Sequence, residues 1–144
     1  MAGYSETPLP KKLGIRQDAR VALVNAPRGF ANELEPLPAG IKLKTNTIGK
    51  SAFDIIVFFA KSQAELFGGV SALANRLTPA GGLWIGWPKK ASGLATDLTE
   101  AIVRAAGLET GLVDNKVCAI NDIWSGLRFV IRLRDRSPKM KAKE

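Results

Sequence analysis

Cationic side chains and one serine follow three apolar runs of the sequence. These residues are Arg28, Lys61, Lys89, Lys90 and Ser92. Lysine, arginine and hydroxyl groups bind a phosphate or a carboxylate when the loops that carry them converge. The sequence therefore predicts an anion-binding site at these residues. The alternative is a set of solvated loops, in which the two lysines pair with Asp97 in a surface interaction worth about 0–1 kcal/mol.

Histidine is absent from the sequence, and this absence removes most catalytic and metal chemistry. Ser-His-Asp and Cys-His arrangements are excluded, and the commonest zinc ligand is missing. The 13 acidic residues are scattered and form no cation-binding motif such as DxDxDG. We therefore expect no metal site, and the sequence assigns no catalytic residue.

The single cysteine and the lack of a long apolar run bear on the cellular compartment. Cys118 cannot form an intramolecular disulfide, and within VCAI it alternates like a small buried strand residue. No apolar run approaches the roughly 18 residues that a membrane span requires. We therefore expect a cytoplasmic protein with no membrane segment.

Half of the net charge of +8 lies near the C-terminus. Residues 1–131 carry 15 basic and 11 acidic groups, whereas residues 132–144, RLRDRSPKMKAKE, carry 6 and 2. This composition predicts a single domain over 1–133 and a mobile basic tail over 134–144. The tail could contact nucleic acid through its phosphates, with weak and sequence-independent affinity, or it could serve only as a solubilising terminus.

Apolar periodicity and turn residues predict alternating strands and helices. Strands are expected at 19–25, 41–46, 53–60 and 83–87, with a final pair at 112–120 and 127–133 around the turn NDIWSG. A brief helix is expected at 30–34, and a longer one begins with a capping box at Ser62 and Glu65 and ends before Pro79. After the turn TPAGG and the strand at 83–87, another helix is expected from an N-cap at Thr96 to a stop at Gly107.

This order predicts an α/β fold with a small, doubly wound and mostly parallel sheet, helices on both faces and a C-terminal antiparallel hairpin. The segment LTPAGGLWIGW and the closing hairpin resemble those of class I methyltransferase-like Rossmann folds. Ligands of such sheets bind outside the carboxyl ends of the strands. The cationic loops should therefore converge there on a crevice that also holds Asn25, Asp122 and Trp124.

The loops that would hold a nucleotide cofactor lack the expected motifs. S-adenosylmethionine requires a glycine-rich loop after the first strand and an acid after the second, but NAPRGF has one glycine, and Thr45 and Asn46 stand where the acid is expected. A dinucleotide likewise needs close backbone approach to its pyrophosphate. The sequence therefore predicts no cofactor.

A second resemblance extends over nearly all of the chain. The segments GYSETPLPKKLGI, GGLWIGWPKKASG, ATDLTE, GLVDNKVCAI and WSGLRFVIR are similar to those of an uncharacterised bacterial domain-of-unknown-function family. This resemblance implies a small, cytoplasmic, Rossmann-like domain, and it implies no catalytic residue.

Three hypotheses for the function follow from these observations. The first is a non-catalytic Rossmann-like binding or regulatory module whose partner is a small anion or a protein. The second is a small enzyme, resembling a degenerate methyltransferase, that acts on an anionic substrate held by Arg28, Lys89 and Lys90, with Asp122 as a base. The third is non-specific binding of nucleic acid through the tail. Polar residues at 114–116 indicate an edge strand, so the chain is expected to be a monomer or a homodimer.

Overall fold

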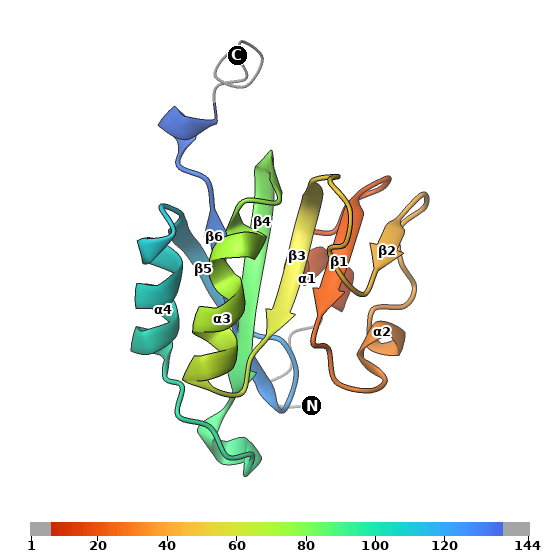
Figure 1. The fold of residues 1–144 in the computed structure, drawn as a ribbon. Coiled ribbons are helices and arrows are strands. Elements are labelled where there is room, and N and C mark those ends of the chain that lie inside the picture. Colours follow the sequence, from red (N-terminus) through yellow and green to blue (C-terminus); the bar gives the residue numbers. More distant parts are fainter. Residues whose placement is uncertain (1–6, 137–144) are drawn as a thin grey trace.

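The computed structural model describes residues 7–136 and contains a six-stranded sheet in the order β2-β1-β3-β4-β6-β5 (Figure 1). The strands are β1 (Arg20–Val24), β2 (Lys42–Lys44), β3 (Phe53–Phe59), β4 (Leu77–Pro88), β5 (Val113–Ala119) and β6 (Trp124–Val130). The first four strands pair in parallel, whereas β6 is antiparallel to both β4 and β5. This confirms the predicted mostly parallel sheet with a C-terminal antiparallel hairpin.

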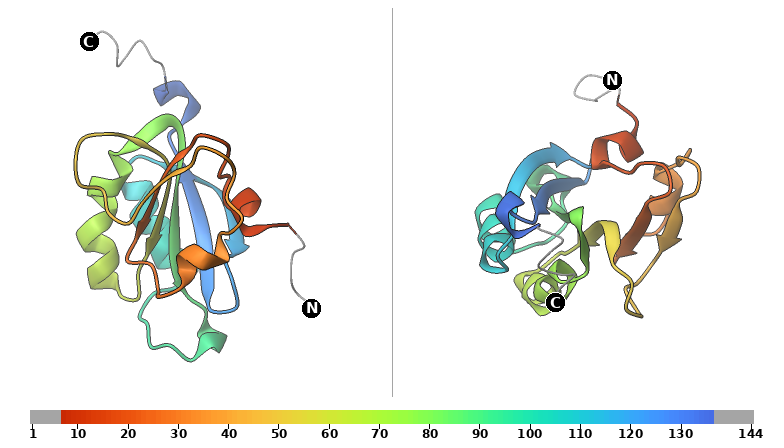
Figure 2. Two further views of the ribbon diagram at one scale, coloured as in Figure 1. Left: turned by 90° about the vertical axis from the view of Figure 1, so that its right-hand side faces the viewer. Right: turned by 90° about the horizontal axis from the view of Figure 1, so that it is seen from above.

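Helices cover both faces of the sheet (Figures 1 and 2). The helices α3 (Gln63–Ala74) and α4 (Glu100–Glu109) lie on one face, and the short helices α1 (Leu9–Leu13) and α2 (Phe30–Glu33) lie on the other. Parallel neighbours in a sheet need crossover connections, and α3 supplies the connection between β3 and β4. The prediction of helices on both faces of the sheet is therefore confirmed.

Each face of the sheet has its own apolar core. On β3, Ile56 and Phe58 belong to the core under α3 and α4, whereas Val57 and Phe59 belong to the core under α1 and α2. This alternation is what a strand buried on both faces requires. The Nε1 group of Trp84 donates a buried 2.9 Å hydrogen bond to the carbonyl oxygen of Leu13, which attaches α1 to the sheet.

The segment TPAGG was predicted as a turn, but it lies within β4. The pairing of β3 with β4 passes from Phe53 with Leu77 to Ile55 with Gly82, so residues 78–81 form an irregular stretch inside the strand. A proline is tolerated where the hydrogen-bond ladder is interrupted in this way. The pairing of β4 with β3 therefore begins at Leu77, before the proline and glycines that predicted a turn.

The caps of the two long helices differ from the predicted ones. Ser62 accepts the amide of Glu65 as expected, but the Glu65 carboxylate accepts the amide of Lys61 at 2.8 Å, one residue before the predicted partner. The N-cap of α4 is Thr99, which accepts the amide of Ile102, and not Thr96. The predicted stop at Gly107 also lies inside α4, which ends at Glu109.

The second strand of the C-terminal hairpin begins and ends three residues earlier than predicted. Trp124 was placed in a polar turn, but it is the first residue of β6, is buried, and pairs with Pro88 of β4. After β6 a short 3₁₀ turn, η2 (Leu133–Asp135), includes the first residues of the predicted tail. Residues 137–144 of that tail lie outside the described residues. Within residues 7–136, no helix is both long enough and apolar enough to cross a bilayer.

Candidate functional site

Ligands are predicted to bind at the end of the sheet where the parallel strands β1 to β4 have their C-terminal residues (Figure 1). We call this end the carboxyl edge. Backbone hydrogen bonds join its loops: the Lys89 amide donates to the Ile123 carbonyl at 2.8 Å, and the Ala60 amide donates to the Gly86 carbonyl at 2.9 Å. The side-chain amide of Asn121 also donates to Glu33 at 3.0 Å. The loops after β3 and β4 and the hairpin turn therefore converge as predicted, and α2 joins them.

The cations of the carboxyl edge belong to separate loops and project largely into solvent. Arg28, Lys61 and Lys90 are exposed, and Lys89 is partly buried. The Ser92 hydroxyl donates to the Lys89 carbonyl at 2.7 Å and accepts the Leu94 amide, so it closes its own turn. The anion-binding role of these residues stays a prediction.

Asp97 does not pair with the two lysines of this edge. Its carboxylate accepts the backbone amide of Gln63 at 2.8 Å, and its carbonyl accepts the side-chain amide of the same residue at 3.0 Å. Asp97 therefore supports the N-terminus of α3 and ties the loop before α4 to it. Among residues 7–136, no ion pair neutralises Lys89 or Lys90.

A cavity of about 340 Å³ opens at the ends of β1 and β2. Its lining combines apolar and polar groups from Leu23, Asn25, Ala26, Pro27, Gly29, Phe30, Ala31 and Thr45. The loop can turn sharply here because Asn25 has φ 58° and Gly29 has φ 84°, a region that asparagine and glycine tolerate best. No atom lies within 4 Å of a Cβ built on Gly29, so this backbone is open to a ligand.

Buried aromatic rings pack in the core next to the carboxyl edge. The rings of Phe59 and Trp124 pack edge to face at 5.0 Å, and those of Phe30 and Phe59 do so at 4.8 Å. Trp124 is 5% exposed, so it is part of the core. Of the predicted crevice residues, Asn25 lines the cavity, Asp122 is exposed in the hairpin turn, and Trp124 is structural.

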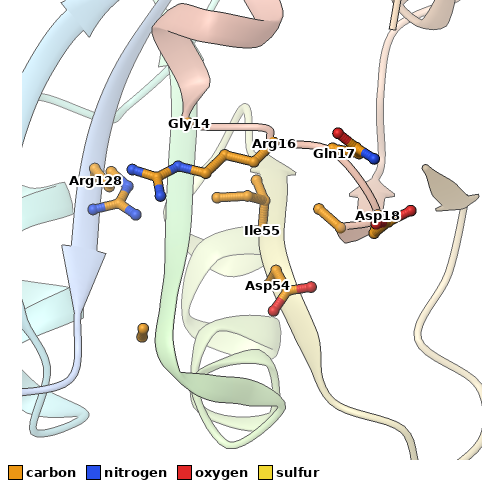
Figure 3. A pocket seen from close by; sticks show the side chains of 9 residues that line it. Gly14, Arg16, Gln17, Asp18, Asp54, Ile55 and Arg128 are labelled. Carbon is orange, nitrogen blue, oxygen red and sulfur yellow. The ribbon is translucent and has the colours of Figure 1, made fainter. Parts of the chain in front are cut away.

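A second cavity, of about 430 Å³, lies near the ends at which β1 and β3 begin (Figure 3). Its lining residues are Gly14, Arg16, Gln17, Asp18, Ala19, Asp54, Ile55, Ala80 and Arg128. Burial lowers the pKa of the Arg128 guanidinium, and the charges of Arg136 and Arg16 lower it further. The sequence did not predict this cavity, although Arg128, a cation among the apolar residues of β6, was a signal for it.

Other titratable groups add no separate reactive centre to the described part of the chain. Burial raises the pKa of the Cys118 thiol, against the opposing charges of Lys12 and Lys116. The thiol is therefore less ionised than a free cysteine at neutral pH. Among residues 7–136, no group of three cysteine or acidic side chains is arranged to hold a metal ion.

Comparisons with solved structures identify proteins of similar fold. A TehB-like SAM-dependent methyltransferase from Corynebacterium glutamicum is 10% identical with a TM-score of 0.55, and the match covers 91% of each chain. A ribosomal-protein methylase from Lactobacillus delbrueckii is 15% identical with a TM-score of 0.61, covering 85% of this chain and 74% of its own. Magnesium protoporphyrin IX methyltransferase from Synechocystis, solved with bound SAH, is 11% identical with a TM-score of 0.57, covering 85% of this chain and 78% of its own.

These comparisons confirm the methyltransferase-like Rossmann architecture. No protein-family model matches the sequence, and no curated protein matches it either. The resemblance to a domain-of-unknown-function family therefore stays a prediction.

The prediction of no cofactor is contradicted by the same neighbours, which include SAM-dependent methyltransferases and one structure with SAH. The prediction rested on a missing glycine-rich motif and a missing acid. The fold nevertheless forms a cavity there with two positive-φ residues, Asn25 and Gly29. Its volume falls within the roughly 300–1,000 Å³ of small-molecule sites, and its apolar walls with Asn25 and Thr45 fit the nucleoside part of such a cofactor.

Proposed function

We propose that the chain binds S-adenosylmethionine in the cavity at the ends of β1 and β2 and methylates a small anionic acceptor. The observation that carries this proposal is the cavity itself, with its open loop backbone at Gly29, on a sheet of methyltransferase-like architecture. In sheets of this kind, ligands bind outside the carboxyl ends of the strands.

The residues around the cavity have distinct roles in this proposal. Leu23, Pro27 and Phe30 offer apolar surface to a purine ring, while the side chains of Asn25 and Thr45 offer hydrogen-bonding groups to its polar atoms. Bound S-adenosylmethionine supplies an electrophilic methyl group on a sulfonium centre. The loop after β1 would hold that group in one orientation, which is a large part of catalysis in a reaction between two bound molecules.

The charge of the carboxyl edge supports an anionic acceptor. Arg28, Lys61 and Lys89 stand on loops that end at this edge, and a cationic rim raises the local concentration of anions. A carboxylate or phosphate oxygen is already ionised at neutral pH, so it needs no general base before it reacts. The absence of histidine from the sequence is therefore compatible with this chemistry.

Calorimetric titration with S-adenosylmethionine and S-adenosylhomocysteine tests the cofactor site. Ala31 is an exposed residue that lines the cavity, and Ala105 is an exposed residue on α4. Ala31→Trp should fill the cavity and weaken binding at least ten-fold, whereas Ala105→Trp adds the same ring elsewhere and should leave it unchanged. Equal affinities in the two variants, or no binding to the parent protein, would refute the site.

Turnover distinguishes an enzyme from a binding module that uses the same cavity. The parent protein should release S-adenosylhomocysteine when it is supplied with S-adenosylmethionine and a mixture of small carboxylic acids and phosphate esters. Arg28→Ala should slow this release by reducing the attraction of the acceptor. Cofactor binding without release of S-adenosylhomocysteine would favour the non-catalytic binding or regulatory module.

Nucleic-acid binding through the tail stays a prediction, because residues 137–144 lie outside the described residues. If the tail carries such binding, removal of residues 134–144 should abolish it, and affinity in the parent protein should fall steeply with salt. Retention of affinity after the truncation would exclude this role for the tail.

A further inference from the structure

The cavity near the amino ends of β1 and β3, called the arginine cavity from here on, brings together two arginines from distant parts of the chain. Arg16 follows α1, and Arg128 belongs to β6. Figure 3 shows the two guanidinium groups next to one another, to one side of Ile55. Two like charges repel when they face each other in this way, so this arrangement needs an explanation.

Neither arginine has a compensating partner within residues 7–136. The ion pairs among these residues involve Arg104 and Arg134. The arginine side chains that form hydrogen bonds are those of Arg20, Arg76, Arg104 and Arg136. Arg16 is exposed, whereas Arg128 is partly buried, and the neighbouring charge of Arg136 acts on Arg128 as well. A partly buried cation without a counter-ion is an unfavourable arrangement unless a ligand supplies the opposite charge.

Two acids, Asp18 and Asp54, also line the arginine cavity, and neither forms an ion pair with Arg16 or Arg128. The Asp54 carboxylate accepts the backbone amide of Arg20 at 2.9 Å and the hydroxyl of Thr78 at 3.0 Å. It lies beyond Ile55 from the two guanidinium groups (Figure 3) and is not within ion-pair distance of either. The arginine cavity therefore has a cationic side and a separate acceptor side.

Gly82 of β4 makes room for the Arg128 side chain. A Cβ built on Gly82 would lie 2.6 Å from the Nε and Nη2 atoms of Arg128, so only glycine lets this guanidinium lie across the strand. The guanidinium therefore lies directly against the backbone of β4.

We propose that the arginine cavity binds a small phosphate-bearing molecule, with its phosphate between Arg16 and Arg128. A guanidinium presents donors in a planar fork that matches two oxygens of a phosphate, and two such forks suit its double charge. Asp54 on the other side can accept from a hydroxyl group of the same molecule, because each carboxylate oxygen has more than one lone pair. A phosphorylated sugar has both features.

Thermal unfolding and calorimetry with inorganic phosphate, ribose 5-phosphate, ribose and succinate test this site at constant ionic strength. Inorganic phosphate and ribose 5-phosphate should each raise the unfolding midpoint of the full chain, and ribose 5-phosphate should bind more tightly. Ribose should have no effect, and any stabilisation by succinate, which the carboxyl edge can attract, should be the same in Arg128→Gln as in the parent protein. No stabilisation by either phosphate compound would overturn the proposal, and a stabilisation by succinate that Arg128→Gln abolishes would overturn the assignment to phosphate.

Two variants with the same change in charge locate the binding. Arg128→Gln should weaken ribose 5-phosphate binding at least ten-fold, whereas Lys44→Gln, at an exposed side chain of β2 that lines neither cavity, should leave it within two-fold. Unchanged binding in Arg128→Gln would place the phosphate elsewhere and overturn the proposal. Arg128→Lys keeps the charge but loses the planar fork, so it should retain the fold and still bind several-fold more weakly.

This proposal is independent of the methyltransferase-type proposal, because the two cavities share no lining residue. Affinity for S-adenosylmethionine should be unchanged in Arg128→Gln, and affinity for ribose 5-phosphate should be unchanged in Ala31→Trp. Loss of both affinities in Arg128→Gln while the fold is intact would show that the arginine cavity is not a separate site.

Discussion

The two ends of the sheet carry positive charge in different ways. At the carboxyl edge, Arg28, Lys61 and Lys90 are exposed on separate loops. In the arginine cavity, an exposed Arg16 faces a partly buried Arg128, which lies over Gly82. A long exposed cation is already satisfied by water, whereas a partly buried and positioned one is not. The number of cations in a sequence segment is therefore a poorer guide to an anion site than burial and the lack of a partner.

The largest expected effect tests whether the carboxyl edge rests on a rigid core. Trp124 is 5% exposed and packs against Phe59, so Trp124→Ala should lower the free energy of unfolding by about 3–5 kcal/mol, measured by urea denaturation. The matched control is Ile123→Ala, because Ile123 is the neighbouring residue and is 42% exposed. Its effect should stay within about 0.5 kcal/mol.

A small effect of Trp124→Ala would mean that the tryptophan belongs to a mobile turn, as its polar sequence neighbours indicated. The carboxyl edge would then lack a fixed base, and its loops would not hold a ligand in one orientation. The two ends of the sheet would then differ in order as well as in charge, with a disordered carboxyl edge and an ordered arginine cavity.

The next effect tests how firmly the loop after β4 is held. Asp97 accepts the Gln63 amide at the start of α3, so Asp97→Ala should cost about 1 kcal/mol of stability, in the range of helix-cap substitutions. Faster amide hydrogen exchange at residues 89–99 should accompany the loss. Glu109→Ala, at an exposed acid at the end of α4, should produce neither change. Equal effects of the two substitutions would show that the contact between Asp97 and α3 does not order the loop.

The bounds of the buried strands could be predicted closely from the sequence, because a short continuous apolar run between turn residues is typical of a strand buried on both faces. The run at 53–60 is β3 at Phe53–Phe59, and the run at 19–25 is β1 at Arg20–Val24. Errors arose where tertiary contacts override local signals. Proline and glycine in TPAGG favour a turn, yet pairing with β3 extends the strand through them. Likewise, Thr99 caps α4 while Asp97, two residues earlier, supports α3.

The candidate sites were less predictable than the fold. The convergence of the carboxyl-edge loops followed from the parallel topology alone, so Asn25 could be placed there. The cavity beside it could not be recognised, because its shape depends on positive φ angles at Asn25 and Gly29 and not on a motif. The meeting of Arg16 with Arg128 depends on the position of α1 over the sheet. That position is fixed partly by the hydrogen bond from Trp84 to Leu13, which no local pattern encodes.

The smallest expected effect bears most directly on the difference between the two ends. Arg128→Met keeps a long apolar side chain over Gly82 and removes a partly buried charge that faces Arg16, so in phosphate-free buffer it should raise stability by about 0.5 kcal/mol. Arg28→Met removes a charge from an exposed side chain and should change stability by less than that. Both values come from urea denaturation at one ionic strength, because salt screens the repulsion. The gain from Arg128→Met should reverse when ribose 5-phosphate is present, since the parent protein alone is then stabilised by the ligand. A loss of stability in Arg128→Met without any ligand would mean that the guanidinium already has a favourable partner in the folded chain, and the contrast between the two ends would not hold.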